Sequence, residues 1–356
     1  MVTSAFWLLL LHLIFMLQTP VVNTCLGGCE SLPDIKYVNC SDRSVVTALD
    51  NFPVNTEYLD MSRNLLTTLP SGSFGPLWGL KVLLLRENNI TSVADGAFVK
   101  LNSLRKLDLS QNQLSALGDG FSLGLDSLTE LVLAHNHLSV LESTNFENLH
   151  NLVKLDVSAN IIEIVKPRAL GSLTALRRLH FQRNRLTTLG LDFFSTLHSV
   201  EVLRLQGNQI NMTEPGAFAS LCNLVLLDLT FNQLSGLHFK MLLGICASNA
   251  HVLLEGNPWH CDCDLQRVFR KLASIHRLFL DDYEKLRCNE PAELKGSLMV
   301  EVADGLCVAE TVTVLILTVT VLITVLAAIV MGEKNKRRGS AKDWTEETSL
   351  DDYCDN

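Results

Sequence analysis

The chain has 356 residues, of which 47% are hydrophobic and only 19% are charged, and its mean hydropathy is +0.23. This composition excludes an intrinsically disordered chain, because such chains combine low hydrophobicity with high net charge. A formal charge of −9 and the lack of an extended basic run argue against a nucleic-acid binder. Ten cysteines are more than an ordinary cytosolic enzyme carries unless they bind metal, so the cellular compartment becomes the first question.

The first predicted element is a secretory signal peptide over residues 1–24. Residues 5–17 form an apolar run that only His12 interrupts. A run of 13 residues has the length of a signal-peptide core and is shorter than the roughly 20 residues that a membrane-spanning helix needs. We therefore expect export from the cytosol and cleavage between Thr19 and Thr24, with an uncleaved membrane anchor as the alternative.

The central part of the chain repeats with a countable period. The pattern LxxLxLxxNxL recurs with its asparagines 24 residues apart, and a ninth copy follows after an interval of 25. The nine asparagines are Asn64, Asn88, Asn112, Asn136, Asn160, Asn184, Asn208, Asn232 and Asn257. Within LxL the leucines alternate with other residues, as a short strand with one buried face requires. No single repeat can bury its own apolar face, so the array must fold by stacking and needs closed ends.

Two further positions complete the repeat. The asparagine must turn inward, and because a buried amide needs hydrogen bonds, we expect it to contact backbone groups of neighbouring repeats. Ten residues later a bulky apolar side chain predicts a second spine on the convex side, made of Phe74, Phe98, Phe146, Leu170, Phe194, Phe218 and Leu242. The third repeat departs from this pattern, with Phe121 one place early and Ser122 in register, which predicts a local shift.

Over residues 25–307 these features resemble the extracellular leucine-rich-repeat family. The resemblance implies an α/β fold, in which residues 56–256 form a curved solenoid with a parallel sheet on its concave face. Cysteine-rich caps at both ends would close the solenoid. At ~4.8 Å per strand the concave strip would be about 40 Å long, which is large enough for a protein ligand. In this architecture function usually lies on the open concave sheet.

The N-terminal cap is expected over residues 25–55. The family usually has C-x₃-C-x-C followed by a fourth cysteine, and here Cys25, Cys29 and Cys40 match while Ser31 stands at the third position. By that pattern Cys29 pairs with Cys40. Cys25 is then left without a partner in the cap, so it is either free or forms an intermolecular disulfide.

The C-terminal cap is expected over residues 257–307, where the sequence NPWHCDCDL and two later cysteines resemble the family's cap. The family pairing implies two disulfides, Cys261–Cys288 and Cys263–Cys307. His260, Cys261 and Cys263 could instead belong to a zinc ligand set, but in a secreted compartment disulfides are favoured. The cap would seal the last hydrophobic layer and do no chemistry.

One more disulfide and three glycosylation sites are expected. Cys222 and Cys246 occupy nearly corresponding positions of adjacent repeats, and strands ~4.8 Å apart make a disulfide between them reasonable. Sequons begin at Asn39, Asn89 and Asn211. Asn89 follows a ladder asparagine and should face outward, whereas Asn39 has cysteine as its middle residue and can be skipped.

The sequence contains no HExxH, GxxxxGK[ST] or GxSxG motif, so it indicates no enzyme, metal or cofactor. The candidate partner-binding residues are strand positions on the concave face. A basic patch on repeats five to seven consists of Lys154, Arg178, His180, Arg183 and Arg204. An apolar spot on repeat two consists of Val82 and Leu84. The patch would suit an acidic protein surface or a sulfated glycan, with the apolar spot as a second anchor. The alternative is that Asp156 and other carboxylates neutralise the patch in a solvated face.

A membrane-spanning helix is predicted over residues 311–331. These 21 residues contain no charge, glycine or proline and, at ~1.5 Å each, span about 31 Å. Five Lys or Arg residues against one Glu follow over 332–342, so the positive-inside rule predicts a type I plasma-membrane protein with its N-terminus outside. A buried globular helix is the alternative. Within this span, small residues recur every four positions, at Thr320, Thr324 and Ala328. Such a stripe permits the close approach of a second helix. The alternative is that the threonines are simply tolerated in lipid.

The tail, residues 332–356, has a basic half and an acidic half and is too short for a signalling domain.

These features suggest two main functions and a third possibility. The first is a cell-surface recognition or adhesion protein that binds a protein partner and signals through partners. The second is an auxiliary subunit of an ion channel or receptor, suggested by the missing stalk before the span, the small-residue stripe and the basic flank. That layout resembles the leucine-rich auxiliary subunits of potassium channels, although nine repeats exceed the number expected there. The trophoblast-glycoprotein type of growth-factor-signalling inhibitor is a third possibility.

Overall fold

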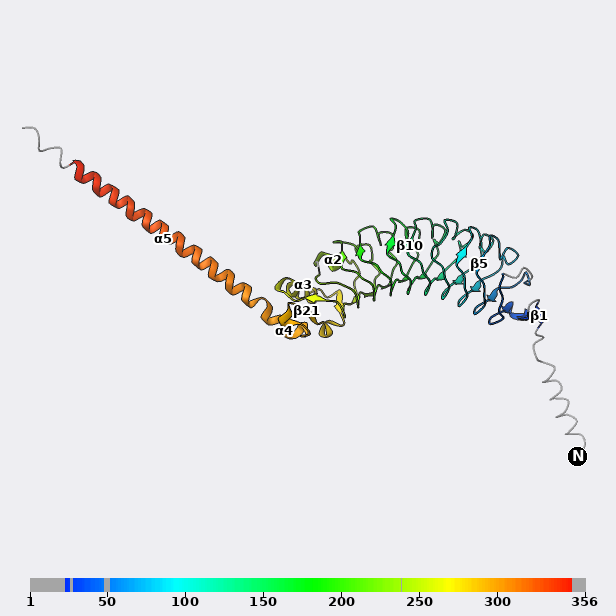
Figure 1. The fold of residues 1–356 in the computed structure, drawn as a ribbon. Helices are drawn as coiled ribbons and strands as arrows, with labels where there is room; N and C mark the ends of the chain where they lie inside the picture. The colour runs from blue at the N-terminus through cyan, green and yellow to red at the C-terminus, as the bar shows by residue number, and fades with distance from the viewer. Residues whose placement is uncertain (1–22, 26–27, 48–51, 238, 348–356) are drawn as a thin grey trace, which may run out of the picture.

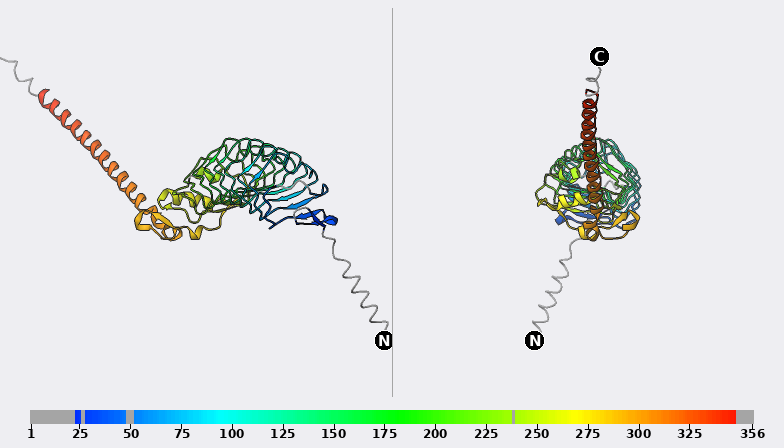
Figure 2. Two further views of the ribbon diagram at one scale, coloured as in Figure 1. Left: turned by 45° about the vertical axis from the view of Figure 1, so that its right-hand side comes forward. Right: turned by 90° about the vertical axis from the view of Figure 1, so that its left-hand side faces the viewer.

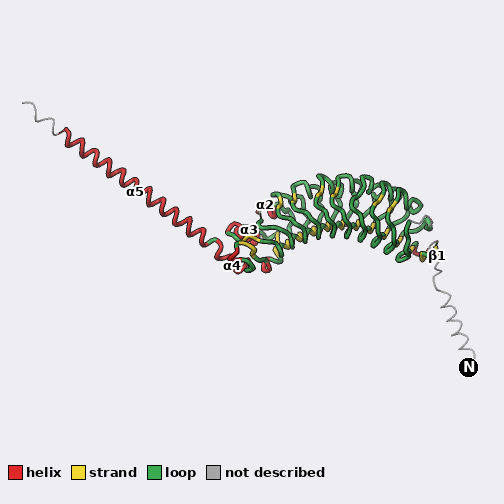
Figure 3. The backbone as a smooth tube through the Cα atoms, in the orientation of Figure 1, coloured by secondary structure: helices red, strands yellow, loops and turns green. Residues whose placement is uncertain are grey.

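The computed structural model describes residues 23–25, 28–47, 52–237 and 239–347 of the chain. These residues form an arc-shaped solenoid that carries a long helix at its C-terminal end (Figure 1). Figure 2 shows the same arc from two further directions, with the helix extending away from the solenoid. Short strands follow one another along the inner, concave side, and loops and turns make up most of the outer side (Figure 3). The predicted repeat solenoid with a parallel sheet is therefore confirmed.

The concave sheet contains thirteen strands, to which each repeat contributes one. From β3 onward neighbouring strands are parallel, so that Leu107 pairs with Leu83 on one side and with Leu131 on the other. In the N-terminal cap the pairing is antiparallel, between β1 and β2 and between β2 and β3. In sheet order the strands are β1 (Asn23–Cys25), β2 (Cys29–Leu32), β3 (Tyr37–Asn39), β4 (Tyr58–Asp60), β6 (Val82–Leu84), β8 (Lys106–Asp108), β9 (Glu130–Val132), β11 (Lys154–Asp156), β13 (Arg178–His180), β15 (Val202–Arg204), β17 (Leu226–Asp228), β18 (Ala250–Leu253) and β20 (Leu278–Leu280).

Smaller elements lie outside this sheet. Three parallel strand pairs belong to the outer part of the repeats: β5 (Thr68–Leu69) with β7 (Ser92–Val93), β10 (Val140–Leu141) with β12 (Ile164–Val165), and β14 (Thr188–Leu189) with β16 (Met212–Thr213). The cap adds β19 (Trp259–His260) paired with β21 (Cys288–Glu290). The helices are η1 (Pro33–Ile35), α2 (Phe239–Leu243), α3 (Cys263–Ala273), η2 (Tyr283–Lys285), η3 (Ala292–Leu294), α4 (Met299–Leu306) and α5 (Val308–Glu347).

The ladder asparagines hold the repeats together, as the pattern predicts. Asn136 is buried, and its Nδ2 donates to the carbonyls of Leu109 and Leu133 at 3.0 Å each. Its Oδ1 accepts the backbone N–H of Leu114 at 3.0 Å. Leu109 belongs to the preceding repeat, so one amide links two turns of the solenoid. The same arrangement recurs at Asn88, Asn112 and Asn160.

The convex spine is also formed. Its seven predicted members are at most 2% exposed. Phe74 and Phe98 stack with ring centroids 6.2 Å apart and an interplanar angle of 11°. Phe121 continues the spine, but it meets Phe98 edge-on at 86°, and Ser122 is buried beside it. The predicted local shift in the third repeat therefore takes the form of a rotated ring within an unbroken core.

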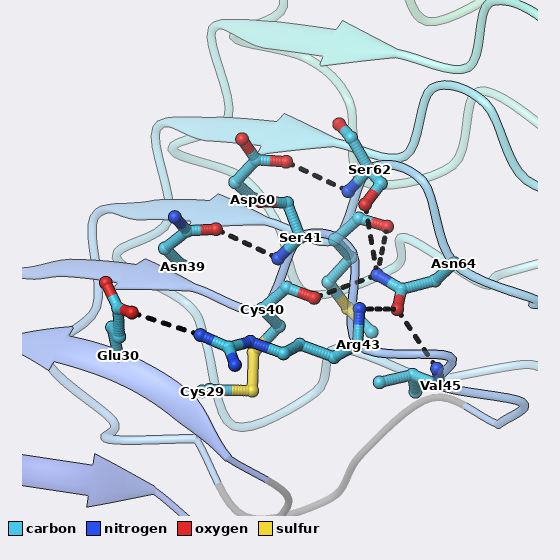
Figure 4. Close-up of a disulfide and its surroundings, with 11 residues drawn as sticks. Cys29, Glu30, Asn39, Cys40, Ser41, Arg43, Val45, Asp60, Ser62 and Asn64 are labelled. Carbon is cyan, nitrogen blue, oxygen red and sulfur yellow. Dashed lines mark hydrogen bonds and ion pairs between the residues drawn. A yellow bond between two sulfur atoms is a disulfide. The ribbon is translucent and has the colours of Figure 1, made fainter.

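The N-terminal cap is joined to the first repeat through Asn64, as Figure 4 shows. Its Oδ1 accepts the backbone N–H groups of Arg43 and Val45 at 3.1 and 3.0 Å. Its Nδ2 donates to the carbonyl of Cys40, which forms a disulfide with Cys29. Of the expected signal peptide, residues 1–22 lie outside the described residues, and the last two lie on β1. Cys25 also lies on β1, and its side chain is outside the described part.

The described residues form four disulfides, and they are the four pairs expected from the sequence: Cys29–Cys40, Cys222–Cys246, Cys261–Cys288 and Cys263–Cys307. Because Cys261 and Cys263 are both oxidised, the alternative zinc ligand set is not formed. Among the described residues, no cluster of His, Cys, Asp and Glu side chains could hold a metal ion.

The C-terminal cap closes the core with buried side chains of its own. Trp259 is fully buried and meets Phe269 of α3 edge-on with centroids 6.0 Å apart. Asp282 ends the ladder, because its Oδ2 accepts the N–H groups of Leu254 and Glu255 at 2.7 and 2.6 Å. Burial raises the pKa of Asp282 even though these two bonds favour its charged form.

Helix α5 includes a segment, Thr311–Lys334, that is long and apolar enough to cross a membrane, with a mean hydropathy of 3.0. None of this segment is buried against the solenoid, which excludes the alternative of a buried globular helix. α4 ends at Leu306 and α5 begins at Val308, with Cys307 between them tied to α3 by its disulfide. The cap is thus joined to the apolar segment without a flexible stalk.

Candidate protein-binding surface

Two rows of side chains flank the buried leucines of the concave sheet. The first row contains Tyr37, Tyr58, Val82, Lys106, Glu130, Lys154, Arg178, Val202, Leu226, His251 and Phe279. The second contains Asn39, Asp60, Leu84, Asp108, Val132, Asp156, His180, Arg204, Asp228 and Leu253. In the views of Figures 1 and 3 no other described element lies across this face, so both rows are open to a partner.

The middle of the first row is internally neutralised. Glu130 lies between two lysines, with Lys154 Nζ 2.9 Å from its Oε1 and Lys106 Nζ 3.4 Å from its Oε2. Burial opposes ionisation of Glu130, but the two lysines more than compensate and hold its pKa below the usual value. Lys154, which the sequence assigns to the basic patch, therefore already has a carboxylate partner.

His180 is paired in the second row. Its Nδ1 lies 3.4 Å from Asp156 Oδ2, and both side chains are largely buried. Asp156 Oδ1 also accepts the N–H and hydroxyl of Ser158 at 3.0 and 2.6 Å. Burial again opposes ionisation, but the bonds from His180 and Ser158 lower the pKa of Asp156. For Lys154 and His180 the structure thus supports the alternative of neutralised side chains.

Three arginines of the basic patch remain unpaired. Arg178 on β13 and Arg204 on β15 are exposed at the surface of adjacent strands. Arg183 is exposed on the turn after β13, with φ of 57°. None of the three forms an ion pair within the described ranges. The structure therefore brings the five predicted residues together on repeats five to seven, and of these five only the three arginines lack an ion pair with a described residue.

The apolar spot is larger than the sequence indicates. Val82 and Leu84 are half-buried on β6, and Tyr58 is the strand neighbour of Val82. Tyr37 is the next neighbour, with its ring centroid 4.9 Å from that of Tyr58. Burial raises the pKa of both tyrosines. Tyr37 was missed because it lies in the cap, outside the 24-residue period, although the alternation in Tyr37–Asn39 is a strand signal.

The sequons divide between the concave face and the rest of the surface. Asn39 lies in the second row beside Asp60, and its Oδ1 accepts the N–H of Ser41 at 2.9 Å (Figure 4). Asn89 and Asn211 are exposed and lie outside the concave strands.

The small residues of the apolar helix offer a smooth surface and no free donors. The hydroxyl of Thr320 donates to the carbonyl of Leu317 at 2.8 Å, and that of Thr324 donates to Val321 at 2.8 Å. Because both hydroxyl protons are already donated within α5, the stripe of Thr320, Thr324 and Ala328 offers a second helix close packing and acceptor oxygens but no free hydroxyl donor.

The leucine rich repeat family profile matches residues 54–114, 78–138, 126–186 and 174–234, which together cover just over half of the chain. The zebrafish leucine-rich repeat-containing protein 3B is 33% identical over 63 residues. That alignment spans 18% of this chain and 23% of the relative, so the chain matches less than a quarter of the relative's length.

Two solved structures are similar over most of the chain. Human trophoblast glycoprotein, also called Wnt-activated inhibitory factor 1, has a TM-score of 0.58 and 26% identity, over 80% of this chain and 96% of that one. A chain of the octameric complex of latrophilin 3, Unc5D and the leucine-rich-repeat protein FLRT2 has a TM-score of 0.55 and 25% identity. It covers 76% of this chain and 96% of its own.

Proposed function

Because the chain belongs to the leucine-rich repeat family and carries a helix apolar enough to cross a membrane, we propose that it is a cell-surface recognition or adhesion protein. In this proposal α5 crosses the plasma membrane once, the N-terminus is extracellular, and a protein partner binds the concave face. The Lys and Arg residues after the span support the orientation, since cytoplasmic flanks carry an excess of them. Solenoids of this family typically serve as non-enzymatic scaffolds, and no catalytic residue is assigned.

The observation that carries the proposal is an open concave sheet with unpaired arginines at its surface. Repeat solenoids use such extended concave surfaces for binding. From β4 to β18 the strip is eight strand steps long, or about 38 Å at ~4.8 Å per step, which is sufficient for an interface of roughly 800 Å² per partner. The similar FLRT2 chain, solved in a complex with latrophilin 3 and Unc5D, supports a protein partner in general.

The charge pattern favours an acidic protein surface as the partner. Arg178 and Arg204 form no ion pair among the described residues, although Asp228 is the strand neighbour of Arg204. Arginine is enriched at the energetic centres of interfaces. Four strand steps separate β13 from the apolar spot of Val82 and Leu84 on β6, or about 19 Å. A folded protein domain can contact both regions at once, which would give the interface a charged and an apolar anchor.

Charge reversal at the two arginines tests the proposal. The full-length chain in lipid nanodiscs is labelled and titrated onto cultured cells, and the double variant Arg178→Glu, Arg204→Glu is compared with the wild type. We expect at least about tenfold weaker binding, because the change removes two attractions and adds two repulsions.

The matched control is Arg168→Glu with Arg185→Glu, which makes the same change in net charge at exposed positions off the concave strands. Equal binding by the wild type and the concave double variant would contradict the proposal. Binding that survives trypsin treatment of the target cells, but is lost after heparinase, would replace the protein partner with a sulfated glycan.

A second function, lateral association with an ion channel or receptor in the same membrane, is favoured by the missing stalk. Only residues 308–310 separate Cys307 from Thr311, so the cap lies against the bilayer in the proposed topology. The small-residue stripe of α5 permits close approach of another helix. A role in inhibiting growth-factor signalling belongs to this class, and the similar trophoblast glycoprotein is also called Wnt-activated inhibitory factor 1.

A chimera separates the two functions. Residues 311–331 are replaced by the membrane helix of an unrelated protein while the ectodomain and tail are kept. Lateral association through α5 predicts loss of crosslinking to membrane neighbours, whereas concave recognition predicts unchanged binding to target cells. Retention of all lateral crosslinks by the chimera would exclude α5 as the contact.

A further inference from the structure

A row of left-handed residues follows the strands at the rim of the concave face. The residue before each ladder asparagine has a φ between 52° and 75°. This row consists of Arg63, Glu87, Gln111, His135, Ala159, Arg183, Gly207, Phe231 and Gly256. The left-handed region favours glycine and asparagine and disfavours bulky side chains. Phe231 is the one large apolar member of this row, and its φ of 53° is a backbone conformation that is unfavourable for an aromatic residue.

The ring of Phe231 is exposed and rests on bare backbone. The side chain is 62% exposed, and the backbone N–H is fixed by a 2.8 Å bond to the carbonyl of Glu255. A Cβ atom on Gly256 would lie 2.4 Å from Cδ1 and 2.7 Å from Cε1 of the ring. The glycine thus provides the space for the ring, whose other side faces solvent. This placement adds little to the buried core and leaves a flat apolar surface.

The surroundings of this ring are polarised. On its N-terminal side lie two of the arginines without an ion pair, Arg204 one strand away and Arg183 two repeats away, and they outnumber Asp228, the strand neighbour of Arg204. Gly207 lies between Arg183 and Phe231 in the row and carries no side chain that would separate them. Glu255 lies on the C-terminal side. An acidic group that approaches the ring is therefore attracted to the arginine side and repelled from the other.

We propose that Phe231 is a second apolar anchor of the partner-binding surface, besides Val82 and Leu84, and that Arg204 and Arg183 are the charged anchors next to it. This inference rests on the proposed recognition function and specifies the partner's chemistry. The occupant is a protein loop with a large apolar side chain on the ring and a carboxylate on the arginine side. Two repeats correspond to about 10 Å, which three residues of extended chain span, so the two groups are about three residues apart. Aromatic and arginine side chains together are typical of interface hot spots.

A stability and a binding measurement together separate this role from a structural one. Asparagine tolerates the left-handed region, so Phe231→Asn relieves the backbone while removing the ring. We expect the Tm of the full-length chain to stay equal or rise, and binding to fall about tenfold.

The probe is a displayed library of random linear peptides, selected on the full-length chain in nanodiscs. Enriched peptides should carry an acidic residue about three positions from an aromatic or large aliphatic one.

Two glycines give a matched pair of variants. Gly256→Ala and Gly72→Ala both place a Cβ on a left-handed residue, with φ of 75° and 70°, and Gly72 lies outside the concave strands. Only the first would displace the ring of Phe231, because the Cβ on residue 72 would meet nothing within 4 Å. We expect similar losses of Tm, but weaker peptide binding only for Gly256→Ala.

Three results would overturn the inference: no enrichment over empty nanodiscs, equal binding by Phe231→Asn and the wild type, or equal loss of binding in both glycine variants. Peptides that lose binding to the Arg178→Glu, Arg204→Glu variant but not to Phe231→Asn would refute the anchor while leaving concave recognition intact. Peptides that bind equally to the wild type, to Phe231→Asn and to the Arg178→Glu, Arg204→Glu variant would contradict both the Phe231 anchor and recognition through the concave face.

Discussion

The asparagine ladder leads to a quantitative prediction for Asn136→Ala in the middle of the solenoid. The structure makes the ladder partly redundant, because each carbonyl receives two amides. The Leu109 carbonyl accepts from both Asn112 and Asn136, and the Leu133 carbonyl accepts from both Asn136 and Asn160. Removing one amide therefore leaves both carbonyls with a donor. The N–H of Leu114 has Asn136 Oδ1 as its acceptor and loses it.

The free-energy change follows from this count. One orphaned buried N–H costs about 1–3 kcal/mol, and the two lost 3.0 Å bonds to carbonyls that keep another partner cost about 0.5 kcal/mol each. The third lost bond, 3.4 Å long, adds little, because the Ala134 carbonyl keeps the N–H of Gln111 at 2.9 Å. The sum is about 3 kcal/mol in the free energy of unfolding. For a domain of this size it corresponds to a fall in Tm of roughly 6–12 °C.

Urea and thermal unfolding of the full-length chain, followed by circular dichroism in detergent, measure the effect. The control is Gln113→Ala, an exposed residue whose side chain hydrogen-bonds to His137 at the surface, for which we expect a change within about 0.5 kcal/mol. A loss below about 1 kcal/mol for Asn136→Ala would refute the reasoning, since it would mean that the Leu114 N–H finds another acceptor.

Three other properties of the chain can be tested in the same preparation. Replacing both Cys222 and Cys246 by alanine opens a disulfide of sequence separation 24 and should lower the free energy of unfolding by about 3 kcal/mol, measured in urea against the oxidised wild type. Because burial raises the pKa of Asp282, its contribution to stability is fully present below the unfolded pKa and is lost as the pH rises through the folded pKa. Relative to Asp282→Asn, the wild type should therefore gain stability as the pH falls from 7 towards 4, and parallel pH profiles of the two proteins would contradict this. Asn89→Gln should increase electrophoretic mobility by one N-linked glycan in mammalian cells, and N-glycosidase should abolish the difference; unchanged mobility would mean that the site is unused.

The repeating part of the fold could be predicted because one residue type decides each position. A leucine at the centre of every strand and an asparagine after it fix burial, register and hydrogen bonding at the same time. The 24-residue spacing also places Glu130 between Lys106 and Lys154, but the sequence pattern assigns Lys154 to the basic patch, and these ion pairs were not predicted. Phe121 is buried as expected, but the angle of its ring depends on packing against Phe98, which spacing does not specify.

The candidate site was less predictable because it depends on places where the period does not apply. Tyr37 reaches the first concave row from the cap, 21 residues before Tyr58, and is not in the 24-residue register. Phe231 is not on a strand, and its exposure depends on a left-handed backbone and on Gly256 in the next repeat. The leucine pattern carries no information about either condition.

The direct connection from Cys307 to α5 has a consequence for the entropy of binding. The disulfide to Cys263 and the onset of α5 at Val308 leave no long linker about which the solenoid could swivel. In the proposed topology the membrane therefore restricts the orientations of the concave face before any partner arrives. Less rotational freedom remains to be lost on association, so a modest set of contacts can support binding between membranes that would be weak for the same domain in solution.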